Sequence, residues 1–170
     1  MKSLRLALPL SLLLAASFAL GQSPAQKSFD QLKSLSGSWE GKSSEGKPLL
    51  VTFRETAAGS ALMSEIHGQG PENMISMFNL DGPNRLIITH HCGTGNQPRM
   101  LATSSPDGKA ISFDFLDATN LATPDAGHMQ RVVFTVIDAN HHTEDWTFAA
   151  GNGKEKKVLF DLHRNEMAQK

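Results

Sequence analysis

The chain has 170 residues and one cysteine, and its charge is nearly balanced, with 16 Lys and Arg against 17 Asp and Glu. It has no basic run or stripe, which argues against nucleic acid or an anionic membrane surface as a partner. Because Cys92 is the only cysteine, an internal disulfide is excluded and stability must come from core packing.

Residues Met1–Gly21 have the pattern of a secretory signal peptide, in which Lys2 and Arg5 precede an apolar run over Leu6–Leu20. This run is shorter than the roughly 20 apolar residues that span a bilayer. Small residues at the end of the segment predict cleavage before Gln22. We therefore expect a periplasmic or secreted protein that has no membrane span after cleavage, and whose remaining length suits one domain.

The segment after the expected cleavage site predicts a leader and a short helix. Gln22–Ser28 is polar and is expected to be a flexible leader. Ser28 is then predicted to cap a helix over Phe29–Leu35, whose apolar residues share one side. A helix this short is unstable alone, so we expect it to cover part of a single domain over residues 29–166.

From Ser38 onward, apolar or alternating runs are separated by short segments rich in Gly, Asn and Asp, as in antiparallel hairpins. The longer connection Asp117–His128 could cover an opening. Sequential hairpins favour closure into a barrel over a two-sheet sandwich, because closure removes both exposed edges. The predicted fold is therefore all-β, an antiparallel up-and-down β-barrel of about ten strands with a short N-terminal helix. The expected strands are Ser38–Ser43, Leu49–Glu55, Ala61–His67, Asn73–Leu80, Arg85–Cys92, Arg99–Ser104, Ala110–Leu116, Met129–Ile137, His142–Ala149 and Lys156–Arg164.

The stretch LIITHHCGTGNQPRM, Leu86–Met100, concentrates most of the groups capable of chemistry. Alternation places His90 and Cys92 on the same face as apolar residues, so both are expected to point into the barrel. An imidazole beside a thiol could form a metal site, a haem ligand or an activated nucleophile. The alternative is a hydrogen-bonded core histidine beside a cysteine that acts as a small apolar residue.

A second polar group lies on the ninth expected strand, where His142, Glu144 and Trp146 share a face. A buried Glu144 would need a partner, for which His90, His142 and Arg99 are candidates. Such a group would anchor a ligand, or with His90 would form a metal set. The alternative places this face toward solvent, although Trp146 favours the interior.

The turn after Cys92 offers three further candidates. Asn96 and Gln97 could bind a ligand at the barrel mouth, and Arg99 could donate a forked pair of hydrogen bonds to a carboxylate or phosphate. Equally, Asn96 could hold the turn through its own backbone, and Arg99 could pair with a surface acid.

The segment Gly37-Ser38-Trp39, after a short helix and at the first strand, resembles the calycin barrels, which include lipocalins and fatty-acid-binding proteins. The resemblance implies that Trp39 lies at the closed end against a basic residue of the last strand, here Arg164. Ten strands look more like fatty-acid-binding and nitrobindin-type barrels than eight-stranded lipocalins. The segments THHCGTGNQPRM and HHTEDW also resemble those of exported bacterial proteins of a family of unknown function, which implies no activity.

The chain departs from both ten-stranded families in the residues that bind their ligands. It has no Tyr, which fatty-acid-binding barrels use with an Arg to hold a carboxylate. Nitrobindin-type barrels bind haem through a His near the C-terminus, but His163 is expected to face away from its apolar neighbours. Neither ligand is therefore implied for this chain.

The favoured hypothesis is an exported, non-catalytic barrel that binds a small, mostly apolar ligand. The alternatives are a filled structural or interaction module, and a metal- or haem-binding barrel that uses His90, Cys92 and His142. No catalytic residue and no cofactor is assigned. The ligand-binding candidates are His90, Cys92, Asn96, Gln97, Arg99, His142, Glu144 and Trp146.

Overall fold

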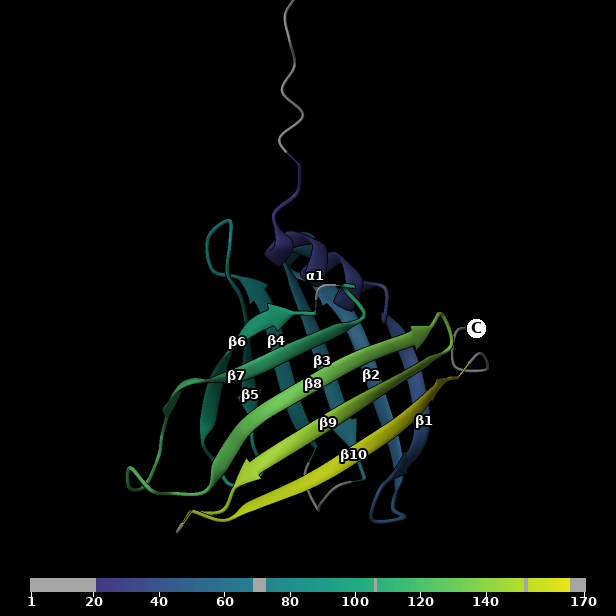
Figure 1. Cartoon of the computed structure of the whole chain (residues 1–170). Helices are drawn as coiled ribbons and strands as arrows, with labels where there is room; N and C mark the ends of the chain where they lie inside the picture. Colours follow the sequence, from purple (N-terminus) through teal and green to yellow (C-terminus); the bar gives the residue numbers. More distant parts are fainter. Residues whose placement is uncertain (1–20, 69–72, 106, 152, 166–170) are drawn as a thin grey trace, which may run out of the picture.

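The computed structural model describes residues 21–68, 73–105, 107–151 and 153–165. Within these residues, ten strands form a closed antiparallel barrel in which neighbours in sequence are neighbours in space, and β1 pairs with β10 (Figure 1). This confirms the predicted up-and-down barrel. The strands are β1 (Gly37–Ser43), β2 (Pro48–Thr56), β3 (Ala61–His67), β4 (Met74–Leu80), β5 (Leu86–His91), β6 (Gln97–Ser104), β7 (Ala110–Thr119), β8 (His128–Asp138), β9 (His141–Ala149) and β10 (Glu155–Arg164), and a 3-10 turn η1 (Ala57–Gly59) joins β2 to β3.

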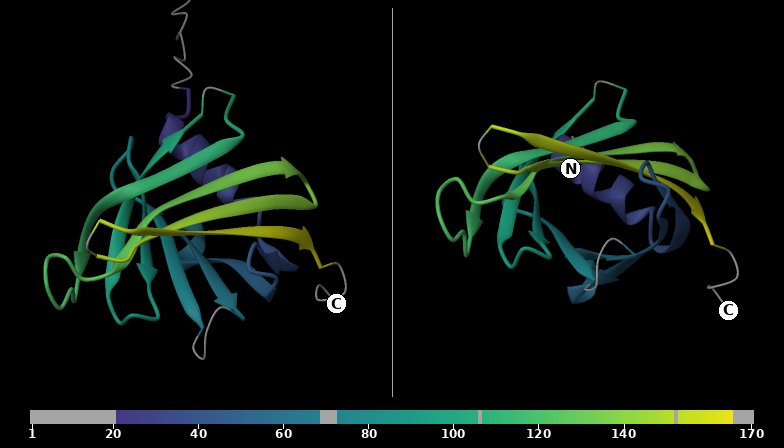
Figure 2. Two further views of the ribbon diagram at one scale, coloured as in Figure 1. Left: turned by 60° about the horizontal axis from the view of Figure 1, so that its bottom comes forward. Right: turned by 90° about the horizontal axis from the view of Figure 1, so that it is seen from below.

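The helix α1 (Pro24–Lys33) covers one end of the barrel, where it packs against β2, β4, β5 and β6 (Figure 2). It begins earlier than predicted because Ser23, not Ser28, is its cap: the Ser23 side chain accepts a hydrogen bond from the backbone N–H of Gln26, and Pro24 suits the first turn. Most of the segment predicted to be a flexible leader is therefore helical. The predicted signal peptide, apart from Gly21, lies outside the described residues.

No helix within the described ranges is long and apolar enough to cross a membrane.

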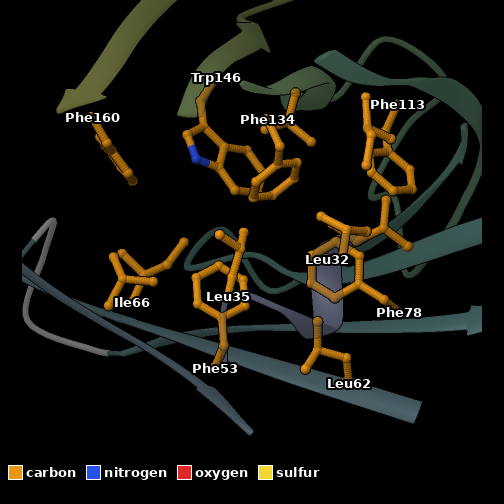
Figure 3. Close-up of a cluster of buried hydrophobic side chains, with 14 of the residues drawn as sticks. Leu32, Leu35, Phe53, Leu62, Ile66, Phe78, Phe113, Phe134, Trp146 and Phe160 are labelled. Atoms are coloured by element: carbon orange, nitrogen blue, oxygen red, sulfur yellow. The ribbon is translucent and has the colours of Figure 1, made fainter. Parts of the chain in front are cut away.

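Aromatic side chains fill the lumen beneath the helix (Figure 3). The rings of Phe78, Phe113 and Phe134, from β4, β7 and β8, meet edge to face with centroids 5.6 to 5.9 Å apart. Phe53 of β2 joins them at 6.4 Å from Phe134. Such pairs add about 0.5–1.5 kcal/mol each beyond the burial of their area. This part of the barrel is a packed core, so space for a ligand must lie farther from α1.

Trp39 closes the helix end of the barrel in the manner implied by the calycin resemblance. Its ring is fully buried, its Nε1–H donates to the carbonyl of Leu35 at 2.7 Å, and the Arg164 guanidinium lies 4.2 Å from the ring centre. The guanidinium also donates to three backbone carbonyls, those of Ser34, Ser36 and Ala139. Arg164 therefore joins the last strand, the first strand and the segment after α1.

Replacing Arg164 with alanine should lower the free energy of unfolding by about 2 kcal/mol, because it removes a cation–π contact and three charge-assisted hydrogen bonds. Lysine at this position keeps the charge but not the fork and should recover only part of the loss. Urea unfolding of each variant measures this. The control is R85A, which removes an exposed ion pair with Asp81 and should cost well under about 1 kcal/mol. An R164A variant as stable as R85A would contradict the assigned role.

Candidate functional site

An apolar pocket of about 90 Å³ lies at the end of the barrel away from α1. The Ser23 hydroxyl donates to the carbonyl of Pro83 in the turn after β4, so the helix lies where β4 ends, whereas the pocket includes Met74, where β4 begins. Apart from His90 and Lys156, the lining is apolar or aromatic. It consists of Ile66, Met74, His90, Met129, Trp146, Phe148, Lys156, Val158 and Phe160.

His90 is the buried polar group of this pocket, and its side chain is fully excluded from solvent. Its Nδ1 lies 2.9 Å from the hydroxyl oxygen of Ser76, its direct neighbour on β4, whereas Nε2 has no hydrogen-bond partner among the described residues. The ring lies 4.9 Å from that of Trp146. Burial, with a smaller contribution from His91, lowers the pKa of His90 from 6.5 to about 4. At neutral pH the pocket therefore contains a neutral imidazole with one free ring nitrogen.

The polar group of β9 points inward, as alternation predicted, but most of it lies deeper than the pocket. Glu144 is fully buried and accepts a hydrogen bond from Trp146 Nε1–H at 2.8 Å, with His142 Nε2 at 3.3 Å from its other oxygen. His142 meets Trp39 edge to face at 4.2 Å, near the closed end. The partners of Glu144 are thus His142 and Trp146, not His90 or Arg99, and of this group only Trp146 lines the pocket.

Cys92 and Asn96 form the turn between β5 and β6, outside the pocket lining. The strand ends at His91, so Cys92 is half-buried in the turn, where its backbone N–H donates to the carbonyl of Asn96. Gly95 adopts a φ of 85°, which favours glycine. The buried Asn96 side chain donates to the carbonyl of Gly127 at 2.8 Å and so ties the turn to the connection between β7 and β8. Cys92 is therefore not among the residues that line the pocket with His90.

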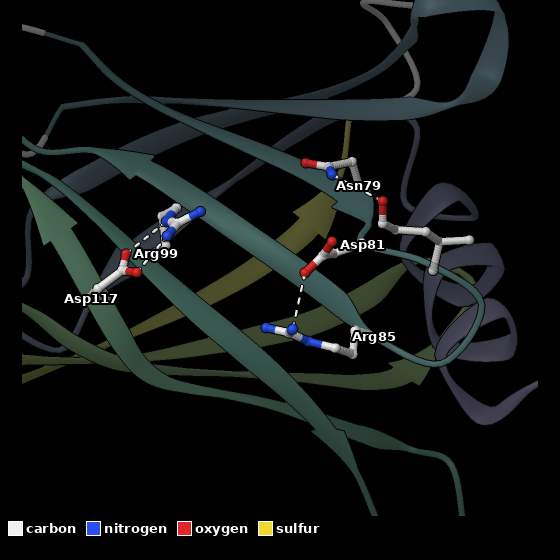
Figure 4. A network of polar contacts seen from close by, with 6 residues as sticks. Asn79, Asp81, Arg85, Arg99 and Asp117 are labelled. Atoms are coloured by element: carbon white, nitrogen blue, oxygen red, sulfur yellow. Dashed lines mark hydrogen bonds and ion pairs between the residues drawn. The ribbon is translucent and has the colours of Figure 1, made fainter.

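Gln97 and Arg99 lie on the outer face of β6. Gln97 accepts a hydrogen bond from the Thr119 hydroxyl at 2.8 Å. Arg99 forms a two-bond ion pair with Asp117 (Figure 4), which lowers the pKa of that carboxyl and raises the pKa of the guanidinium. Arg99 therefore takes the surface-pair alternative and does not contact the pocket.

The predicted metal set is not brought together. Among the described residues, the one group of three or more His, Cys, Asp or Glu ligands within 4.8 Å of one another is His141, Asp161 and His163, on the outer surface. His90 lines the pocket at the end away from α1, whereas His142 packs against Trp39 at the helix end of the barrel. Cys92 lies in the turn after β5. A pocket of about 90 Å³ is also too small for a haem, because ligands of drug size already occupy pockets of roughly 300 Å³ or more.

Several lining residues were not among the predicted site residues. They include Met74, Met129 and Lys156. Ser76, which holds His90, lies two residues before the apolar Phe78 on β4 and so shares its face, which is a sequence signal for its inward position.

These features define a class of protein, a closed ten-stranded antiparallel β-barrel with a helix over one end. No protein-family model matches the chain, and no curated protein matches it. Among solved structures, it is similar to Rv2717c from M. tuberculosis, with a TM-score of 0.56 and 16% sequence identity over 82% of this chain and 98% of that chain. At this identity the likeness shows a shared fold alone.

Proposed function

We propose that this protein is an exported, calycin-like barrel that binds a small, mostly apolar ligand in the pocket at the end away from α1. The observation that carries the proposal is the buried Nε2 of His90, which has no hydrogen-bond partner among the described residues and lies in a mostly apolar lining. An unsatisfied buried polar atom costs about 1–3 kcal/mol, and a ligand with one polar group would remove that cost. Export rests on the pattern of Met1–Gly21, and the calycin relationship rests on Gly37-Ser38-Trp39.

The pocket limits the chemistry of the ligand. Its volume of about 90 Å³ admits a small molecule, or the apolar end of a larger one that extends from the mouth. Either tautomer of His90 can form the bond to the Ser76 hydroxyl, so Nε2 can donate or accept. A ligand hydroxyl can accept a hydrogen bond from Nε2 or donate one to it, so it suits either tautomer. Small alcohols and phenols are therefore the preferred class, with their carbon skeleton against Trp146 and Phe148.

Replacing His90 with leucine should weaken binding of a small phenol or alcohol about 10-fold, because one hydrogen bond is lost. It should hardly change binding of the matching hydrocarbon. Native mass spectrometry and solvent extraction first identify any ligand that co-purifies with the protein. Affinities are then measured by ligand-observed NMR titration of the purified protein. The control, R99A, alters only the outer face and should bind like wild type.

A second variant tests the pocket itself. Val158→Phe adds a ring to the pocket wall and should abolish binding of both the phenol and the hydrocarbon. Failure of wild type to bind any small phenol, alcohol or hydrocarbon, or equal binding by V158F, would refute the proposal.

The packed aromatic core supports a second candidate, a filled module that acts through its surface. In that case, replacing Ser76 and His90 together with alanine and leucine should be neutral or stabilising, because a buried polar pair contributes little over good packing. The two candidates are distinguished because only the binding barrel loses a measurable affinity in this variant.

A further inference from the structure

We propose that His141, Asp161 and His163 form a binding site for a divalent transition metal, best suited to Zn²⁺, on the outer surface of β9 and β10. Asp161 Oδ1 lies 2.8 Å from His141 Nε2 and 3.6 Å from His163 Nε2. The three ligand atoms all lie within 4.8 Å of one another. This site is separate from the pocket of the proposed function, and neither depends on the other.

The register of the barrel creates the site. His141 and His163 are direct partners across β9 and β10, and Asp161 precedes His163 by two residues, so all three side chains leave the same outer face. The two imidazoles stack with centroids 4.2 Å apart and planes at 21°. At Gly41 of β1, any Cβ would overlap the carbonyl oxygen of Asp161, so glycine lets β1 approach β10 closely beneath the site.

The donor set matches zinc. Zinc binds imidazole nitrogen and carboxylate oxygen at about 2.0–2.2 Å, so two donors of a tetrahedral site lie about 3.3 Å apart. The two distances to Asp161 Oδ1, 2.8 and 3.6 Å, bracket this separation. Two imidazoles and one carboxylate suit zinc, copper or nickel, whereas magnesium prefers an all-oxygen set. Three protein ligands leave the fourth position to water or to a group from outside.

The neighbouring charges favour a cation overall. Glu40 of β1 is in register with His163, and Asp138 of β8 is in register with His141. One cation, Lys42, is in register with Asp161. With Asp161 itself, three carboxylates oppose one ammonium around the two imidazoles, so the local field attracts a divalent ion.

Zinc binding to untagged protein tests the site. Isothermal titration at neutral pH should give one Zn²⁺ per chain, and H141Q and H163Q should each weaken binding by about 100-fold. The affinity should fall on acidification, because imidazole must be neutral to bind a metal. Magnesium should not compete. The matched control is H67Q, because His67 forms a pair with Glu65 at 3.6 Å that has no third ligand among the described residues.

The outcomes separate a metal site from a surface ion-pair cluster, whose pairs contribute little to stability and do not bind zinc specifically. H67Q should bind zinc like wild type, and all variants should keep the wild-type circular dichroism spectrum. The proposal is overturned if wild type binds zinc no more tightly than H163Q. Equal losses in H67Q would overturn it as well, because the binding would then be non-specific.

Discussion

Replacing Glu144 with leucine should lower the free energy of unfolding by about 3 kcal/mol. The carboxyl group is fully buried and is the partner of Trp146 Nε1 at 2.8 Å and of His142 Nε2 at 3.3 Å. Its loss leaves two ring nitrogens without partners in the core, and each costs about 1–3 kcal/mol. Urea unfolding at neutral pH measures the change.

A double-mutant cycle identifies the cause. Glu144→Gln keeps an oxygen that can accept from Trp146 and should lose only about 1 kcal/mol. The variant H142L/E144L should be more stable than E144L, because it removes one of the orphaned nitrogens as well. Strictly additive effects of the two leucine substitutions would show that His142 and Glu144 do not interact.

The barrel could be predicted because short, local sequence patterns define its strands and its turns. Alternating runs define strands, and residues such as Gly95 and Asn96 define the turns between them, so the order and direction of strands follow without knowledge of distant contacts. The inward face of β9 was predictable for the same reason, since Glu144 and Trp146 are two residues apart and therefore share a face of the strand. The start of α1 was missed although Ser23-Pro24 is a strong start signal, because the apolar spacing begins only at Phe29.

The candidate site was less predictable because it depends on register between strands. The register of β4 with β5 places Ser76 opposite His90, and the register of β9 with β10 places His141 opposite His163. The outward position of Arg99, by contrast, could be predicted from the local sequence. It alternates with the buried Met100 on β6, which places it outside. Whether the lumen is hollow depends on side-chain volumes from many strands at once, and no local pattern measures them.

Acidification should destabilise the protein through His90. The pKa of this group is lowered by burial from 6.5 to about 4, so the folded state favours the neutral imidazole and the unfolded chain binds the proton more readily. The stabilisation is therefore fully present above about pH 6.5 and is lost as the pH falls toward about 4. A shift of this size corresponds to about 3 kcal/mol.

The test is the free energy of unfolding, measured with urea at several pH values between 7.5 and 4, for wild type and for the S76A/H90L variant. Carboxylates contribute equally to both proteins, so the difference between the two curves isolates the histidine. Wild type should lose about 3 kcal/mol more than the variant across this range. Parallel curves for wild type and S76A/H90L would mean that His90 takes up its proton as easily in the folded barrel as in the unfolded chain. The ring would then be in contact with water in solution, and the buried free nitrogen that supports the ligand proposal would not exist.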